Sequence, residues 1–219
     1  MLRWQGPDTG VLFVVTGASG SGKTTLLRQA LVEIPGVEFS VSATTRSMRA
    51  GEEEGVDYHF VGQTGFDRLL ADEALLEWAR VYDNRYGTPR APVEAALAEG
   101  RSVVLDIDVQ GAAQVRGSFP DAVTIFVLPA SLAALEDRLR SRGTDSEEII
   151  ASRMAQLMDQ VGHCGDFDYL VVNDDLDTAH RCFQAVFLAE FQRRCRREGL
   201  VQAMCGRPAA GTPAGQKTP

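Results

Sequence analysis

Residues 11–25 read VLFVVTGASGSGKTT, and this stretch decides the fold class. Residues 11–15 form a short apolar run rich in β-branched side chains, and a glycine-rich turn follows at once. From residue 23 to residue 32 apolar side chains recur at helical spacing, until Pro35 and Gly36 end the segment. The sequence therefore predicts a buried strand, then a loop, then a helix.

The loop between this strand and helix has the pattern G-x-x-x-x-G-K-[ST], which is typical of a phosphate-binding loop. Its glycines let backbone N–H groups converge on an anion, and the N-terminus of the helix adds partial positive charge. We expect Lys23 to reach the terminal phosphates of a nucleoside triphosphate and Thr24 to offer its hydroxyl to Mg²⁺. The predicted triphosphate site comprises Gly17, Ala18, Ser19, Gly20, Ser21, Gly22, Lys23, Thr24 and Thr25.

The rest of the chain repeats this alternation. The patterns predict strands over 102–105, 122–128 and 170–172, and helices over 109–115, 132–139, 146–161 and 178–197. Strands that alternate with helices imply an α/β fold with a parallel sheet covered by helices, of the P-loop NTPase type.

Residues 37–90 break this rhythm, because they are rich in Ser, Thr, Gly and charge, with short extended runs at 38–41 and 75–82. We predict an inserted mixed α/β subdomain here. The expected organisation is an N-terminal extension (1–10), one domain (11–205) with its core at 11–36 and 91–205 and its insert at 37–90, and a disordered tail (206–219).

Charge and hydropathy exclude several classes of function. The 219 residues include 22 basic and 30 acidic side chains, for a formal net charge of -8, and Lys23 and Lys217 are the only lysines. An excess of acid argues against general binding of nucleic acid or anionic membranes, which depends on positive charge. The chain has no apolar run of about 18 residues and no signal peptide, so we expect a soluble cytoplasmic protein.

A second candidate anion site lies at residues 42–52, SATTRSMRAGE, where Arg46 and Arg49 stand three apart among hydroxyl side chains. Further motifs follow, and they read VDYHF at 56–60, LEWA at 76–79, NRYGTP at 84–89, LDID at 105–108, QG at 110–111 and VND at 172–174. In order and spacing, these motifs and the arginines between residues 138 and 153 resemble the guanylate kinase family, from about residue 11 to residue 197. The resemblance is to a stand-alone enzyme of the bacterial type.

This resemblance implies an ATP:GMP phosphotransferase that uses Mg²⁺ to convert GMP, and also dGMP, to GDP or dGDP in purine nucleotide metabolism and GTP supply. It makes the insert a GMP-binding subdomain and residues 138–153 a short lid. The residues it assigns to GMP are Ser42, Arg46, Arg49, Tyr58, Glu77, Tyr86, Gly87, Thr88 and Asp108.

The residue types fit guanine. A carboxylate such as Glu77 can accept from both N1–H and the 2-amino group, and the hydroxyls of Ser42 and Thr88 can donate to O6. Adenine would leave Glu77 buried without a partner, which can cost roughly 10⁴-fold in discrimination. Tyr58 and Tyr86 are expected to hold the phosphate together with the arginines, although packing alone would also explain both rings.

Transfer between two phosphates needs positioning and charge neutralisation rather than a strong base. By the resemblance, the catalytic residues are Lys23, Arg49, Arg142 and Arg153. It also assigns Arg138, Asn173 and Asp174 to ATP, the last two as contacts on the adenine side. Thr24 and Asp106 are the candidate magnesium ligands, and the choice of Asp106 or Asp108 for magnesium or guanine stays open, since both acids could also be helix caps.

Several alternatives stay open at this point. A phosphate loop alone also suits a hydrolytic motor, a GTPase switch or a scaffold that has kept an old fold. A guanylate-kinase-like interaction module would normally lack the loop, and a kinase of phosphorylated ribose would lack the Glu77 set. Arg85 stands where the family often has an aromatic residue, so it either adds a phosphate contact or faces solvent. The sequence leaves the oligomeric state undetermined.

Overall fold

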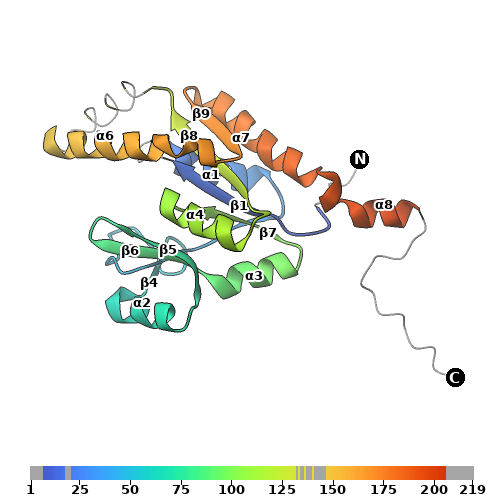
Figure 1. The fold of residues 1–219 in the computed structure, drawn as a ribbon, viewed down its shortest axis with the longest axis horizontal. Coiled ribbons are helices and arrows are strands. Elements are labelled where there is room, and N and C mark those ends of the chain that lie inside the picture. The colour runs from blue at the N-terminus through green and yellow to red at the C-terminus, as the bar shows by residue number, and fades with distance from the viewer. Residues whose placement is uncertain are drawn as a thin grey trace.

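The computed structural model describes residues 7–17, 21–131, 133, 136, 140 and 147–205. Within them five parallel strands form the main sheet, in the order β2-β7-β1-β8-β9 (Figure 1). These strands are β2 (Val37–Phe39), β7 (Ser102–Asp106), β1 (Leu12–Gly17), β8 (Val123–Pro129) and β9 (Tyr169–Asn173). The prediction of a parallel sheet is confirmed.

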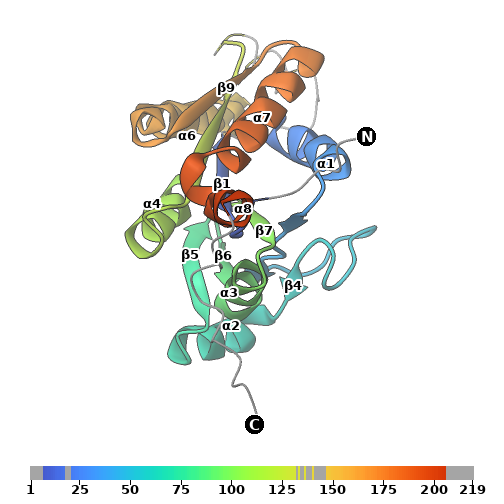
Figure 2. The same ribbon diagram turned by 90° about the vertical axis from the view of Figure 1, so that its right-hand side faces the viewer.

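Helices cover both faces of this sheet, and β1 shows why its sequence is a continuous apolar run. Phe13 and Val15 pack toward α1 (Lys23–Glu33) and α7 (Leu176–Phe191), whereas Leu12 and Val14 pack toward α3 (Arg90–Ala98) and α4 (Val109–Ser118). Figure 2 shows α1 and α7 on one side of the main sheet and α4 on the other. A strand buried on both faces needs apolar side chains at every position. The helix α6 (Glu147–Gly162) precedes β9. Among the helices that the structure describes, none is both long enough and apolar enough to cross a membrane.

A second sheet of four strands lies beside the first, in the order β4-β3-β6-β5. Its strands are β4 (His59–Phe60), β3 (Ala43–Thr44), β6 (Asn84–Pro89) and β5 (Leu75–Val81), and α2 (Gly62–Ala71) packs on it through the buried ring of Phe66. Figure 1 shows this sheet and α2 below the main sheet. The strands β5 and β6 are antiparallel and bring Glu77 opposite Thr88.

The structure corrects the predicted start of the insert at residue 37. The strand β2 pairs with β7 at the edge of the main sheet, so the second sheet begins only with β3. The prediction was wrong because an edge strand needs little apolar burial. Glu38 and Phe39 are both exposed, and Glu38 forms an ion pair with Arg101.

The predicted final helix over 178–197 is also corrected. The helix α7 ends at Phe191, a 3₁₀ turn follows at Arg194–Arg196, and a separate helix α8 covers Glu198–Met204. The turn brings Arg196 back onto Glu190 at 2.8 Å, and both side chains are buried. A buried carboxylate needs such a partner, and a straight helix would carry Arg196 away from it. A second 3₁₀ turn, Cys164–Asp166, lies between α6 and β9.

Candidate active site

The predicted phosphate loop leaves the carboxyl end of β1, where parallel α/β sheets usually bind their ligands. Gly17 ends β1, Asp106 ends β7 and Asn173 ends β9, so three separate strands bring these residues to one edge of the sheet. Ala18, Ser19 and Gly20 lie outside the described residues. Lys23 opens α1 directly after the loop.

Lys23 forms an ion pair with Asp106, and both side chains are less than one-fifth exposed. Thr24 and Thr25 are exposed at the start of α1. The carboxylate of Asp106 and the hydroxyl of Thr24 are oxygen donors, which Mg²⁺ prefers. Among the described residues there is no group of three or more His, Cys, Asp or Glu side chains that could hold a metal ion by themselves. This donor set therefore fits an ion that takes its remaining ligands from phosphate and water.

Asn173 contacts the phosphate loop itself. Its side chain is 5% exposed, and Nδ2 donates a 2.7 Å hydrogen bond to the backbone carbonyl of Ser21. Gly22 has φ +83°, and a Cβ atom at Gly22 would overlap the Asn173 amide. The glycine of the motif is thus required by the backbone conformation and by the approach of β9. The neighbouring Asp174 is exposed.

Glu77 and Thr88 form the centre of the second half of the site. Thr88 Oγ1 donates a 2.6 Å hydrogen bond to Glu77 Oε1, and the residues are 4% and 0% exposed. Burial raises the pKa of Glu77 to about 7; the hydrogen bond from Thr88 lowers that pKa, and the nearby negative charge of Asp108 raises it further. Thr88 has one hydroxyl proton, so while it is donated to Glu77, Ser42 is the predicted residue left to donate to O6.

The N-terminus of α4 lies directly against Glu77. Asp108 caps this helix by accepting a 2.8 Å hydrogen bond from the backbone N–H of Gly111. A side chain at Gly111 would overlap Glu77 Oε2. Asp108 is therefore a helix cap beside Glu77, whereas Asp106 is paired with Lys23 at the phosphate end.

Arg46 is held in a fixed position by neighbours on three sides. Its guanidinium makes two hydrogen bonds with Glu52, at 2.7 and 3.0 Å, and lies over the rings of Tyr58 and Phe60, 5.4 and 5.7 Å from their centroids. The hydrogen bonds to Glu52, and a smaller one to Tyr86, raise the pKa of Arg46 above its ordinary value. The Arg46 fork is therefore engaged by Glu52, which fixes the positive charge of the guanidinium beside the Tyr58 ring.

Two observations connect the halves of the site. The rings of Tyr58 and Tyr86 meet at 5.7 Å between centroids. Burial raises the pKa of Tyr58, and repulsion from Asp106 adds to that rise, so the Tyr58 hydroxyl lies within electrostatic range of the phosphate-loop half.

The other residues predicted to bind GMP lie in the same sheet and its loops. Ser42 is half-buried just before β3, and Arg49 is exposed, with its backbone N–H donating to Glu52 Oε2 at 2.8 Å. Gly87 is buried, and a Cβ there would collide with β5.

Arg85 has a structural role, and neither predicted alternative holds in full. Its guanidinium forms a 2.8 Å ion pair with Asp67, donates to Gln63, and lies 4.8 Å above the ring of Phe66. The side chain is about one-fifth exposed. It joins β6 to α2 and does not point freely into solvent.

The predicted lid falls largely outside the described residues. Arg138 and Arg142 lie there, and of Arg153 only the backbone, within α6, is described. Arg140 is exposed and pairs with Glu136 at 2.8 Å. Its side chain therefore faces solvent.

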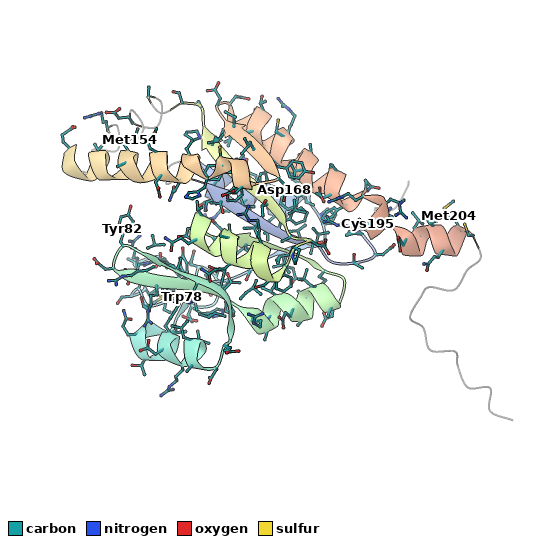
Figure 3. All side chains as sticks on the ribbon, viewed as in Figure 1. Trp78, Tyr82, Met154, Asp168, Cys195 and Met204 are labelled. Carbon is teal, nitrogen blue, oxygen red and sulfur yellow. The ribbon has the colours of Figure 1, made fainter. Side chains whose placement is uncertain are left out.

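Sequence reasoning missed Gln114, which clamps the strand that carries Glu77. Its side-chain carbonyl accepts a 3.1 Å hydrogen bond from Trp78 N–H, and its amide donates a 2.7 Å bond to the Trp78 carbonyl. Trp78 lies on β5 above α2 (Figure 3), with its ring 6.4 Å from that of Phe66. The role of Gln114 depends on a contact 36 residues away, which no local motif encodes.

Comparison with known proteins gives consistent results. The family model described as guanylate kinase matches residues 10–190. The chain is 50% identical to the guanylate kinase of Bradyrhizobium diazoefficiens over 193 residues, covering 88% of each chain. It is 48% identical to that of Carboxydothermus hydrogenoformans over 181 residues, covering 83% of this chain and 89% of the relative. The crystal structure of guanylate kinase from Anaplasma phagocytophilum superposes with a TM-score of 0.76 at 31% identity, covering 93% and 97% of the two chains.

Proposed function

Because this chain belongs to the guanylate kinase family, we propose that it transfers the γ-phosphoryl group of ATP to GMP, giving ADP and GDP. The same site accepts dGMP, because the residues assigned to GMP are proposed to contact its base and its phosphate, and dGMP differs from GMP only at the ribose 2′ position. A further phosphorylation of GDP gives GTP, so the reaction belongs to purine nucleotide metabolism and supports the supply of GTP.

The observation that carries this proposal is the buried Glu77, hydrogen-bonded to Thr88 at one end of the site. Guanine brings two donors, N1–H and the 2-amino group, to such an acceptor, while Ser42 donates to O6. Adenine brings no donor to the same position. A buried acceptor left without a partner destabilises the complex by about 1–3 kcal/mol, and by more when the acceptor is charged. AMP is therefore a poor acceptor substrate.

The phosphate of GMP binds the second basic group. Arg46 is already oriented by Glu52 over the Tyr58 ring, and Arg49 stands three residues further along the same loop. Tyr58 and Tyr86 add hydroxyl groups. The acceptor oxygen of GMP is already an anion, so no general base is required, and the chain contributes position and positive charge.

Lys23 exchanges its partner during the reaction. Its ammonium group pairs with Asp106, and when ATP binds, the terminal phosphates replace that carboxylate as its partner. Thr24 and Asp106 are the residues that would hold Mg²⁺, which when bound neutralises charge on the β- and γ-phosphates. Arg49 bridges donor and acceptor, while Arg142 and Arg153 close over the phosphates from the lid. The attacking oxygen forms one P–O bond as the bond to the β-phosphate oxygen breaks, and ADP leaves.

The decisive experiment measures ADP release from ATP with GMP, dGMP, AMP, ribose 5-phosphate or no acceptor. We expect turnover with GMP and dGMP, and little with the others. Equal turnover with GMP and AMP would overturn the guanine assignment. Turnover with ribose 5-phosphate alone would identify a sugar-phosphate kinase, and no turnover with any acceptor would favour an interaction module.

A further inference from the structure

Asn173 lies between the end of β9 and the turn that begins α1. Its amide reaches Ser21, which is 152 residues earlier in the chain, at a donor–acceptor distance of 2.7 Å. The side chain is 5% exposed, and Ser21 is completely buried. Gly22 adopts φ +83° beneath it, where any side chain would overlap the Asn173 amide. The contact is therefore close and buried, and it requires both the amide of Asn173 and the absence of a side chain at Gly22.

The chemistry of the peptide bond gives this contact a consequence. A trans peptide places the carbonyl of one residue and the N–H of the next on opposite sides of the same plane. Asn173 holds the Ser21 carbonyl toward β9, so the N–H of Gly22 must point the other way. In a phosphate-binding loop the backbone N–H groups are the anion ligands, and their carbonyls must be directed elsewhere. Asn173 satisfies one of those carbonyls, which would otherwise be buried without a partner.

We propose that Asn173 is a positioning residue for the triphosphate. It acts through the Ser21–Gly22 peptide plane and not through contact with the base of the donor nucleotide. This inference rests on the proposed function, because it assumes that residues 17–24 bind the triphosphate of ATP. It differs from the expectation drawn from the family resemblance, in which Asn173 contacts adenine.

The two roles predict different dependence on the ligand. A residue that contacts adenine affects ATP and leaves a ligand without a base unchanged. A residue that orients the loop affects every ligand with a triphosphate group by a similar factor. The effect should also be confined to the donor side, because the Asn173 side chain bonds to Ser21 at the phosphate loop, whereas Glu77 bonds to Thr88 in the second sheet.

The test uses the full chain with Asn173→Leu, which keeps the branched shape but loses the donor, together with Asn173→Ala. Val172→Ala is the matched control, because Val172 is the preceding residue of β9 and is 51% exposed. Calorimetry measures the binding of ATP and of inorganic triphosphate, each with Mg²⁺. We expect both Asn173 variants to weaken both ligands by a similar factor of roughly tenfold, as for the loss of one hydrogen bond. The control should bind both as wild type does.

Steady-state kinetics adds a readout that general destabilisation would not give. The KM for ATP should rise while the KM for GMP stays within about twofold of wild type. A loss confined to ATP would overturn the inference in favour of a base contact, and equal binding by wild type and Asn173→Leu would overturn it outright. Wild-type protein that binds triphosphate but does not phosphorylate GMP would instead overturn the proposed function alone.

Discussion

Thr88 Oγ1 donates a 2.6 Å hydrogen bond to Glu77 Oε1 across the antiparallel pair β5 and β6. The register of the hairpin fixes this pair, since the two residues face each other although they are 11 positions apart in the chain. Both side chains are buried, so the carboxylate is removed from water with one hydroxyl as a partner. Burial of the Glu77 carboxylate costs free energy, and the two donors of guanine would offset part of that cost by hydrogen-bonding to it.

Replacing this carboxylate should separate GMP use from ATP use. In Glu77→Gln one acceptor oxygen becomes an NH₂ donor, which faces the N1–H and amino donors of guanine. We expect kcat/KM for GMP to fall by roughly 100-fold, while the affinity for ATP is retained. Glu94→Gln, the same change on the exposed part of α3, is the matched control. Unchanged GMP kinetics in Glu77→Gln would mean that another residue reads the base.

The same carboxylate predicts a pH dependence of stability. Burial raises the pKa of Glu77 from its ordinary value of 4.5 to about 7 in the folded state. Between these two values the folded protein binds a proton that the unfolded chain has lost, so the free energy of unfolding falls as pH rises from about 4.5 to about 7. The full loss is at most about 3 kcal/mol.

Thermal unfolding of wild type and Glu77→Gln at several pH values measures this effect. The variant should be more stable than wild type at pH 8, and the difference should shrink as the pH falls below 4.5, where Glu77 becomes neutral in the folded and the unfolded state alike. Adding GMP should also shift the wild-type curve, because donors on the ligand favour the ionised form. A difference in stability that does not vary with pH would contradict the assignment.

Substitutions of Lys23 and of Asp106 should affect different properties of the enzyme, turnover in the first case and the Mg²⁺ requirement in the second. Lys23→Ala removes the point charge on the terminal phosphates, and turnover should fall by roughly 10³-fold while the fold persists. Asp106→Asn keeps Lys23 but removes the carboxylate oxygen proposed for Mg²⁺, so the concentration of Mg²⁺ needed for half-maximal activity should rise. Arg28→Ala, which removes an exposed cation from the same helix, is the control. A Lys23→Ala enzyme within tenfold of wild type would refute the role of this lysine.

The parts of the fold that could be predicted are those whose signals are local. The strand β1, the glycine loop and α1 follow one another within residues 11–33, so apolar spacing and the motif were sufficient. The family motif assigned Glu77 and Thr88 to the same base, but it did not predict that they face each other within one hairpin or that a hydrogen bond joins them. The end of α7 was missed because it depends on a buried pair, Arg196 with Glu190, that pattern alone does not reveal.

Most features of the site that could not be predicted from the sequence are contacts between residues far apart in the chain. Asn173 and Ser21 meet only because β9 and β1 are both part of the main sheet, and Gln114 meets Trp78 because α4 lies against β5. A side chain that binds backbone atoms leaves no pattern of residue types at its target. Its role becomes visible only when the strands and helices are placed.

Substitution of Arg85 should lower the stability of the fold without affecting the binding of GMP, whereas loss of a ligand contact would do the reverse. Arg85→Ala removes the ion pair with Asp67 and the stacking on Phe66, so the free energy of unfolding should fall by about 1 kcal/mol. The KM for GMP should stay within about twofold of wild type. Asp67→Asn should lower stability by less, since the stacking remains. A large rise in KM for GMP without loss of stability would show that Arg85 holds the phosphate after all.

Gln114 should control how precisely β5 presents Glu77 to the base. Gln114→Ala removes both hydrogen bonds to the Trp78 backbone, whereas Gln114→Glu keeps the acceptor for the N–H but places a carboxylate oxygen against the Trp78 carbonyl. Because Trp78 adjoins Glu77, we expect the KM for GMP to rise by roughly 3- to 10-fold in both variants, with the KM for ATP unchanged. Gln192→Glu, the same change of charge at the exposed end of α7, should leave both constants as in wild type. If the Gln114 variants lose stability yet bind GMP normally, the clamp supports the fold and does not position the base-reading carboxylate.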